Sequence, residues 1–378
     1  MDREVLRRRI ARNQRNILIH NCVKVGICVV AALGVVTLGW HFAEPILKKA
    51  DIKLDEDHKQ VAQVLAGTNY VEDGSEDAMV GALTAGQVVA SAAPGWQVDT
   101  TGWWYAADSQ TSYQNGWVEI EGQRYHFGKD GYMDTGWSAI GGKGYYFDDH
   151  GILDPNKDSS KMLALTFDDG PGPNTGQILD VLQQTGAKAT FFMLGKSVEE
   201  YGADTVPRMA ALGCDLGNHS FDHPYLADQT VEIAQDQFAR TDQLIAQYNN
   251  GVGASVIRFP YGNFTAEQAA ATNRSCWFWN SDTMDWDTQN TNSIIDAIRT
   301  SAEDGALILM HDVYDETVEA CKVVIPELVS QGWQLVTVRE LAQAKGYDIF
   351  PGATYYGFTD RILSEGADHV YSFDDTHQ

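Results

Sequence analysis

The sequence predicts an α/β fold, a seven-stranded barrel that is incomplete or distorted, preceded by β-hairpin repeats and an N-terminal membrane helix. Three observations lead to this prediction. Short apolar runs alternate with amphipathic segments in the second half of the chain, aromatic residues recur at a fixed period before them, and an arginine-rich segment followed by an apolar stretch opens the chain. Regular alternation of strand-like and helix-like segments indicates parallel strands joined by right-handed crossovers.

The strands are expected in the apolar runs Met162–Phe167, Ala189–Leu194, Gly213–Gly217, Val256–Phe259, Cys276–Asn280, Ala306–Met310 and Gln334–Val338. Amphipathic segments such as 176–186 and 230–249 lie between them and have the length of crossover helices. Seven strands favour a distorted barrel over an open doubly wound sheet. No glycine-rich phosphate loop follows the first run, which disfavours a nucleotide-binding fold.

The N-terminus is expected to anchor the chain in a membrane. Six arginines precede the apolar stretch 25–40, which extends back to Ile17 if a few polar residues are tolerated near one end. The positive-inside rule then predicts a single-pass protein of the cell membrane, with the N-terminus inside and the rest of the chain extracellular. A cleaved signal peptide is the alternative, although no small-x-small cleavage site follows Trp40.

Charge and cysteine content exclude several classes of protein. The formal net charge is −25, which argues against nucleic acid and anionic lipid as partners. Only Cys214, Cys276 and Cys321 lie beyond the apolar N-terminal stretch. An odd number of cysteines excludes a disulfide-rich scaffold, and we expect buried free thiols.

An internal repeat precedes the strands. Trp117 recurs as Trp137 and Phe127 recurs as Phe147, both at a period of 20 residues, and a degenerate earlier copy begins near Trp96. Alternating aromatics with Gly or Asp-Gly turns indicate one hairpin in each copy. Single hairpins cannot bury their aromatic faces, so we expect them to stack as a solenoid.

These hairpin units resemble the choline-binding and glucan-binding repeats of Gram-positive surface proteins. In that family, Trp and Tyr of neighbouring hairpins form a cage for choline by cation–π attraction. The resemblance implies a choline or glycan ligand held by Trp103, Trp117, Tyr125, Trp137 and Tyr145. The alternative is that these aromatics only pack the hairpins together.

Ionisable residues cluster just after five of the predicted strands. They are Asp168 and Asp169, His219 and His223, Arg258, Asp282 and Asp285, and His311 and Asp312. Polar residues gathered at one end of successive strands are typical of a barrel active site. One carboxylate and two imidazoles supply three ligands and leave a hydrolytic metal an open position. A second carboxylate can accept a proton, and a separate histidine can donate one.

Five motifs carry a second resemblance: TFDDGP, HSFDH, RFPYG, DTMDW and LMHD, in this order. They resemble those of the polysaccharide deacetylases of carbohydrate esterase family four. The resemblance implies a distorted (β/α)7 barrel and the hydrolysis of N-acetyl groups. It covers residues 158–345, and the acidic tail beyond it, 346–378, either packs on the barrel or frays.

By this resemblance, Asp169, His219 and His223 hold a divalent cation, expected to be zinc, with cobalt, nickel or manganese as alternatives. Asp168 is the implied general base, and Arg258 orients it. The resemblance also implies that the cation shares the developing negative charge with the backbone N–H of Tyr261.

The other half of the implied site holds the general acid. His311 protonates the departing amine, and Asp285 orients His311 or tunes its pKa. The implied pocket for the acetyl methyl group is formed by Pro260, Trp286 and Leu309.

The expected organisation is a cytoplasmic basic segment (1–16), a transmembrane signal anchor (17–42), a stalk (43–94), wall-binding-type repeats (95–157), the catalytic domain (158–345) and the tail (346–378). A membrane-tethered barrel joined to such repeats points to N-acetylglucosamine-type residues of cell-wall peptidoglycan as the substrate. Another N-acetylglucosamine polymer and an O-acetylated xylan remain alternatives. A wall-binding surface protein with a vestigial barrel is the alternative from another class.

Overall fold

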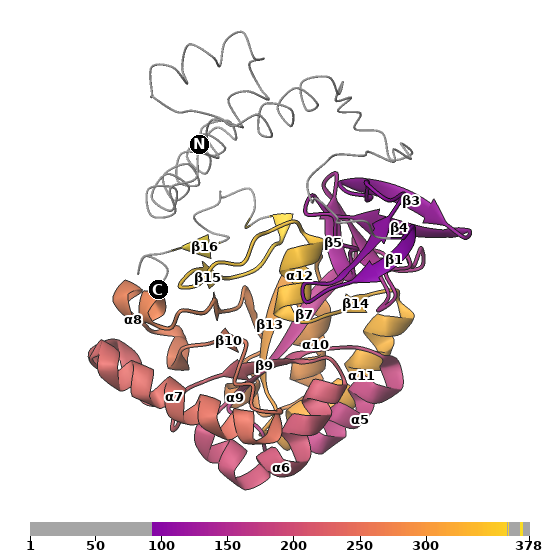
Figure 1. Ribbon diagram of the computed structural model, residues 1–378. Coiled ribbons are helices and arrows are strands. Elements are labelled where there is room, and N and C mark those ends of the chain that lie inside the picture. Colours follow the sequence, from indigo (N-terminus) through magenta and orange to yellow (C-terminus); the bar gives the residue numbers. More distant parts are fainter. Residues whose placement is uncertain (1–92, 361, 363–370, 373–378) are drawn as a thin grey trace. The chain divides into compact units, whose positions relative to one another are not determined.

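The computed structural model describes residues 93–360, 362 and 371–372 (Figure 1). The basic segment, signal anchor and stalk that the sequence predicts over residues 1–94 lie almost wholly outside this range. Within it, no helix has the length and apolar character needed to cross a membrane. The chain divides into two compact units at Asp134 and Thr135, and each is described by itself below.

The first unit contains two antiparallel hairpins. Their strands are β1 (Gly95–Val98) with β2 (Trp103–Ala106), and β3 (Gly116–Ile120) with β4 (Gln123–Phe127). Glu121 and Gly122 both have positive φ, 54° and 79°, which suits the two-residue turns that join tightly paired strands.

Aromatic packing joins these two hairpins. The Trp96 ring centroid lies 5.2 Å from that of Tyr105 within the first hairpin and 5.0 Å from that of Tyr125 in the second. Phe127 is fully buried. The hairpins therefore cover one another's aromatic faces, as the repeat pattern predicts.

The third hairpin belongs to the second unit. It consists of β5 (Gly136–Ile140) and β6 (Lys143–Phe147), and it packs against helix α12 (Val338–Ala344). A Cβ atom on Gly144 would lie only 2.7 Å from the carbonyl oxygen of Ala344, so only glycine permits this approach.

A parallel sheet forms the centre of the second unit. Its strands are β7 (Met162–Asp168), β8 (Thr190–Met193), β9 (Asp215–Asn218), β10 (Val256–Ile257), β11 (Cys276–Trp277), β12 (Ser281–Asp282), β13 (Ala306–His311) and β14 (Gln334–Leu335). Each of the seven predicted runs thus contains strand residues. The fifth run, 276–280, differs from the others. Its strand β11 ends at Trp277 and pairs with β15, and the next strand, β12, begins at Ser281 and pairs with β13.

The sheet is curled. Its hydrogen-bonded path runs from β12 through β13, β7, β8, β9 and β10 to β11, which directly precedes β12 in the chain. The N-terminal residues of β7 also pair with β14, whereas its C-terminal residues pair with β8. The first and last strands of this path, β12 and β11, are therefore neighbours in the sequence, as expected for a sheet that curls back on itself.

Helices cover the outside of this sheet (Figure 1). The long ones are α5 (Thr175–Thr185), α6 (Gly195–Ala211), α7 (Val231–Tyr248), α10 (Thr291–Ser301) and α11 (Asp315–Ser330). The short ones are η1 (Leu226–Asp228), η2 (Pro260–Gly262), α8 (Ala266–Ala271) and α9 (Asp285–Thr288). Alternate residues of β7 enter different clusters: Leu163 packs with α5 and α11 residues, and Ala164 packs with α12 residues. Burial on both faces explains why this strand is mostly apolar up to Phe167.

Part of the C-terminal tail packs on the sheet. Strand β15 (Thr354–Tyr355) pairs in parallel with β11 and in antiparallel with β16 (Tyr371–Ser372). The buried Tyr355 ring stacks on Trp277, with centroids 4.4 Å apart. Of the two alternatives for the tail, packing therefore holds for this segment.

The three cysteines at positions 214, 276 and 321 are buried and free, as the sequence predicts.

Candidate active site

The charged residues that follow the predicted strands meet at one edge of the sheet. Asp168 ends β7 and His311 ends β13, and the two residues are direct partners in the register of these strands. His219 follows β9, Arg258 follows β10, and Asp285 begins α9. The carboxyl ends of parallel strands lie at the same edge, which explains the convergence.

Three side chains at this edge form a possible metal site. Ligand atoms of Asp169, His219 and His223 all lie within 4.8 Å of one another. Asp169 Oδ1 is 3.7 Å from His219 Nε2 and 3.5 Å from His223 Nε2. This oxygen is buried and has no hydrogen-bond partner within the described residues, which is rare for a buried polar atom unless an ion or water occupies the space.

Two of these three residues have a strained backbone conformation. Asp169 has φ 71° and His223 has φ 59°, in the left-handed region that residues with a side chain rarely adopt. Strain of this kind persists only where the surroundings impose it, and it is frequent at functional sites. One carboxylate and two imidazoles also match the donor set of a hydrolytic divalent metal, so the residues fit such an ion.

The orientation of His219 is fixed by the chain. Its Nδ1 donates to the backbone carbonyl of Arg258 at 2.8 Å, so Nε2 carries no proton and faces the carboxylates. Burial lowers the pKa of His219 to about 3, despite the opposing charge of Asp169. The imidazole is therefore neutral, the form that binds a metal.

Asp168 lies beside this trio and is held by Arg258. Its Oδ1 accepts a hydrogen bond of 2.7 Å from Arg258, and its Oδ2 lies 3.5 Å from His219 Nε2. Burial raises the pKa of Asp168, and the Arg258 guanidinium only partly opposes this effect. A carboxylate of raised pKa is a stronger proton acceptor.

Arg258 is fully buried and is held by several hydrogen bonds. Its guanidinium also donates to the carbonyls of Trp277 and Phe278, at 2.8 and 2.7 Å, and to the hydroxyl of Thr166 at 2.9 Å. These bonds fix the position of the carboxylate that Arg258 holds.

His311 is paired with Asp285. Its Nδ1 donates to Asp285 Oδ1 at 2.8 Å, and its backbone N–H donates to Oδ2 at 2.7 Å. Burial lowers the pKa of His311, but the hydrogen bond and charge of Asp285, with the charges of Asp168 and Asp169, outweigh burial and raise this pKa to about 9. His311 is therefore protonated at neutral pH, with Nε2 directed away from Asp285.

The remaining residues that the sequence places in the site differ in exposure. Tyr261 has φ 59°, and its ring lies 4.4 Å from that of His223. Trp286 is 46% exposed, and its backbone N–H donates to Asp285 Oδ1. Pro260 and Leu309 are buried.

Sequence reasoning missed one supporting residue, Thr317, and assigned no role to another, Asp312. Thr317, on α11, donates its hydroxyl proton to Asp285 Oδ2 at 2.7 Å. Asp312 is fully buried, accepts a hydrogen bond from Thr175, and has a pKa raised to about 7 by burial. A Cβ atom on Gly170 would lie 2.1 Å from Asp312, so Asp312 packs tightly against the loop that carries Asp169. In the sequence, only Gly170, which follows the paired aspartates, indicated this contact with Asp312.

The predicted ligand residues of the repeats fall into three groups. Tyr125 and Trp137 are only 8% and 5% exposed, so their rings pack within the protein. A chain cation already lies over two others, with Arg124 4.9 Å from the Trp117 ring centroid and Lys143 5.3 Å from that of Tyr145. Trp103 is exposed. For Tyr125 and Trp137, burial favours the packing alternative.

Comparison with known proteins identifies the family. Residues 155–276 match the family described as polysaccharide deacetylase, and residues 114–151 match the choline-binding repeat. A peptidoglycan-N-acetylglucosamine deacetylase of Bacillus cereus is 31% identical over 198 residues, which cover 50% of this chain and 91% of that protein. The chain belongs to the polysaccharide deacetylase family.

Two further proteins have a similar level of sequence identity to the chain. The peptidoglycan-N-acetylmuramic acid deacetylase PdaC of Bacillus subtilis is 39% identical over 188 residues, covering 50% of this chain and 40% of PdaC. The chain thus spans about two fifths of the length of that relative. A solved structure of a T48 deacetylase with substrate is 36% identical and covers 52% of this chain and 97% of its own, with a TM-score of 0.49.

Proposed function

We propose that this protein is a metal-dependent deacetylase that hydrolyses the N-acetyl groups of N-acetylglucosamine-type residues in cell-wall peptidoglycan. The observation that carries the proposal is the pairing of two half-sites at one edge of the sheet. One is the group Asp169, His219 and His223, whose ligand atoms lie within 4.8 Å of one another. The other is the ion pair that Asp285 forms with His311, which lies on the strand next to Asp168. Family membership and the peptidoglycan deacetylases among the relatives support the same conclusion.

The fold and location follow from the same proposal. The curled sheet corresponds to the distorted (β/α)7 barrel of the family. Residues 17–42 would hold the protein in the cell membrane, with the N-terminus inside and the catalytic domain, 158–345, outside. The repeats, matched to the choline-binding family, would bind a wall ligand through exposed aromatics such as Trp103.

Asp169, His219 and His223 would hold the cation, and we propose zinc because two imidazoles and one carboxylate with an open position suit it. When bound, the cation polarises the acetyl carbonyl and makes water more acidic. Cobalt, nickel and manganese remain alternatives for this donor set. Metal analysis of the purified protein tests the assignment.

The residues of the chain perform the proton transfers. Asp168, held by Arg258, accepts the proton of the water that attacks the acetyl carbon. The backbone N–H of Tyr261 donates to the carbonyl oxygen as it gains negative charge. His311 gives its Nε2 proton to the amide nitrogen as the C–N bond breaks, and Asp285 stabilises the imidazolium before this transfer. The products are acetate and a sugar with a free amine.

Acetate release from purified peptidoglycan, with and without a chelator, tests the proposed function. We expect release that stops on chelation and returns with added divalent metal. Mass spectrometry of the treated fragments separates the alternatives: loss of an acetyl group with a new amine indicates N-deacetylation, and loss without an amine indicates an esterase. If the metal-loaded protein releases no acetate but still binds walls, the wall-binding alternative is correct.

A further inference from the structure

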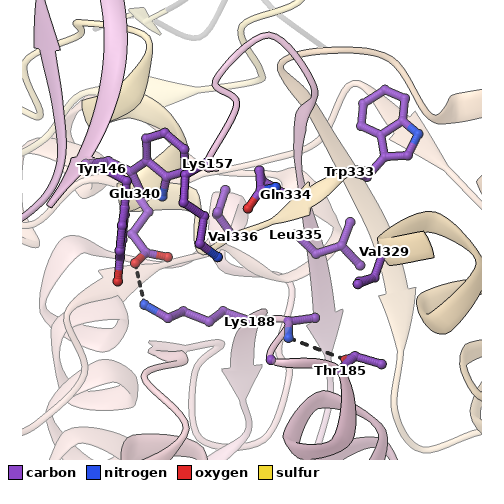
Figure 2. A pocket seen from close by; sticks show the side chains of 13 residues that line it. Tyr146, Lys157, Thr185, Lys188, Val329, Trp333, Gln334, Leu335, Val336 and Glu340 are labelled. Atoms are coloured by element: carbon purple, nitrogen blue, oxygen red, sulfur yellow. Dashed lines mark hydrogen bonds and ion pairs between the residues drawn. The ribbon is translucent and has the colours of Figure 1, made fainter. Parts of the chain in front are cut away.

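A cavity of about 220 Å³ lies within the second unit, between the third hairpin and the sheet (Figure 2). Side chains that line it include Trp137, Tyr146, Lys157, Lys188, Trp333 and Glu340. Tyr146 belongs to the hairpin, whereas Trp333 directly precedes β14. The cavity therefore exists only because this hairpin packs on the sheet.

The cavity is separate from the proposed active site. Lys188 precedes β8 and Gln334 begins β14, so the cavity opens at the edge where the strands begin. The catalytic residues lie where the strands end. Strand β7 has seven residues, so the two edges are about 20 Å apart at a rise of roughly 3.3 Å per residue.

The charges around the cavity leave one lysine unpaired. Lys188 Nζ lies 2.5 Å from Glu340 Oε1, and Glu340 Oε2 accepts from the backbone N–H of Thr337, so this carboxylate is satisfied. Lys157 is exposed and forms no ion pair with any of the described residues. In Figure 2 its side chain extends into the space between Tyr146 and Val336. The cavity thus carries a net positive charge on a chain of net charge −25.

The aromatic rings argue against a cationic ligand such as choline. Lys157 Nζ lies 5.5 Å from the Tyr146 ring centroid, and Lys161 Nζ lies 5.6 Å from that of Trp333. Each ring thus already carries an ammonium group of the chain over one of its faces. Of the residues that line the cavity, Lys157 brings an ammonium group without a carboxylate partner among the described residues, which favours an anion.

The size of the cavity and the residues that line it indicate which kind of molecule bears the anionic group. Drug-sized ligands occupy pockets of roughly 300–1,000 Å³, so a cavity of about 220 Å³ suits a single ring. The aromatic surface can cover the apolar face of a sugar, while Gln334 offers hydrogen bonds to hydroxyl groups.

We propose that this cavity binds one sugar ring that bears an anionic group, with Trp333 and Tyr146 against the ring and Lys157 paired with the anion. This inference rests on the proposed function in one respect: the proposed function suggests that such sugars come from wall polysaccharide. A second contact with the same polymer would keep the chain near its substrate between reactions, because it raises the local concentration of acetyl groups at the active site.

Isothermal titration of the full chain, in the presence of a chelator, tests the inference with three probes: N-acetylmuramic acid, N-acetylglucosamine and choline. The first two sugars differ by one lactyl ether group, which carries a carboxylate. We expect N-acetylmuramic acid to bind about tenfold more tightly than N-acetylglucosamine, since a charge-assisted hydrogen bond contributes roughly that factor. Choline should bind more weakly than either sugar at this cavity.

Variants assign the binding to the cavity. Lys157→Gln should remove the preference for the acidic sugar, whereas Lys322→Gln, the same charge change on the exposed surface of α11, should retain it. Trp333→Ala should weaken both sugars, with its melting temperature measured because Trp333 is half-buried. All three variants should retain acetate release from a small soluble substrate.

Equal affinity for the two sugars, or a preference that survives Lys157→Gln, would overturn the inference. Tighter choline binding that depends on Trp333 would also overturn it. Titration and acetate release are independent readouts: binding that depends on Lys157 without acetate release contradicts the proposed function alone, and acetate release without such binding contradicts this inference alone.

Discussion

Replacing Asp285 by Asn should shift the alkaline limb of the deacetylation rate to lower pH. His311 must be protonated to act as an acid, so activity is lost as pH rises through the pKa of His311. That pKa is raised to about 9, and Asp285 supplies both the hydrogen bond and the largest of the nearby charges that raise it. Without this carboxylate, burial of the imidazole remains and acts in the opposite direction.

The size of the effect follows from the two pKa values. At pH 8, a histidine of pKa about 9 is roughly nine-tenths protonated, whereas one at the ordinary value of about 6.5 is roughly 3% protonated. The Asn variant should therefore lose about 30-fold in kcat/KM at pH 8 through protonation alone, and less at pH 6.

The pH profile of kcat/KM, measured by acetate release from a soluble acetylated chitooligosaccharide, gives the result. Thr317→Val is the matched control, because it removes a hydrogen bond of 2.7 Å to Asp285 but keeps the pair of Asp285 and His311. Its alkaline limb should stay near that of the wild type. If the Asn variant loses activity by the same factor at every pH, Asp285 only positions the imidazole and the electrostatic reasoning is wrong.

Three further predictions concern the metal site and its surroundings. Asp169→Asn should lose stoichiometric metal, and full metal content would contradict the assignment. Acetate release should fall by at least roughly 10–100-fold, the loss that follows when a residue that only hydrogen-bonds a metal ligand is removed. Arg258→Met should lower the free energy of unfolding by about 3–5 kcal/mol in urea titrations, because it leaves a buried carboxylate unpaired, and a loss below about 1 kcal/mol would contradict this. Gly170→Ala should destabilise the protein by more than about 1–3 kcal/mol, since its Cβ would meet Asp312 at 2.1 Å. Gly172→Ala, with its nearest contact at 3.4 Å, is the control, and equal melting temperatures of the two variants would refute the steric reasoning.

The strand positions could be predicted because the sheet is buried on both faces. Such strands are continuous apolar runs, and each of the seven runs contains strand residues. The break between Trp277 and Ser281 could not be predicted, since it depends on a change of neighbour from β15 to β13. The pairing of Tyr355 with Trp277 was equally hidden, because the two residues lie far apart in the chain and the tail is acidic overall.

The candidate site could be predicted as far as its residues lie in motifs that directly follow strands. Asp169, His219 and His223 are such residues, and the structure brings them together. Thr317 and Thr166 support the site from a helix and from mid-strand, at positions where threonine carries no pattern of its own. Their contributions depend on tertiary packing.

The third hairpin shows that a copy of a sequence repeat can be required by the domain that follows it. Trp137 lies in one apolar cluster with Leu341 and Ala344, and Gly144 approaches the end of the same helix. A gene fragment that begins after this hairpin would expose that cluster to water. This last copy of the repeat is therefore part of the fold of the enzyme.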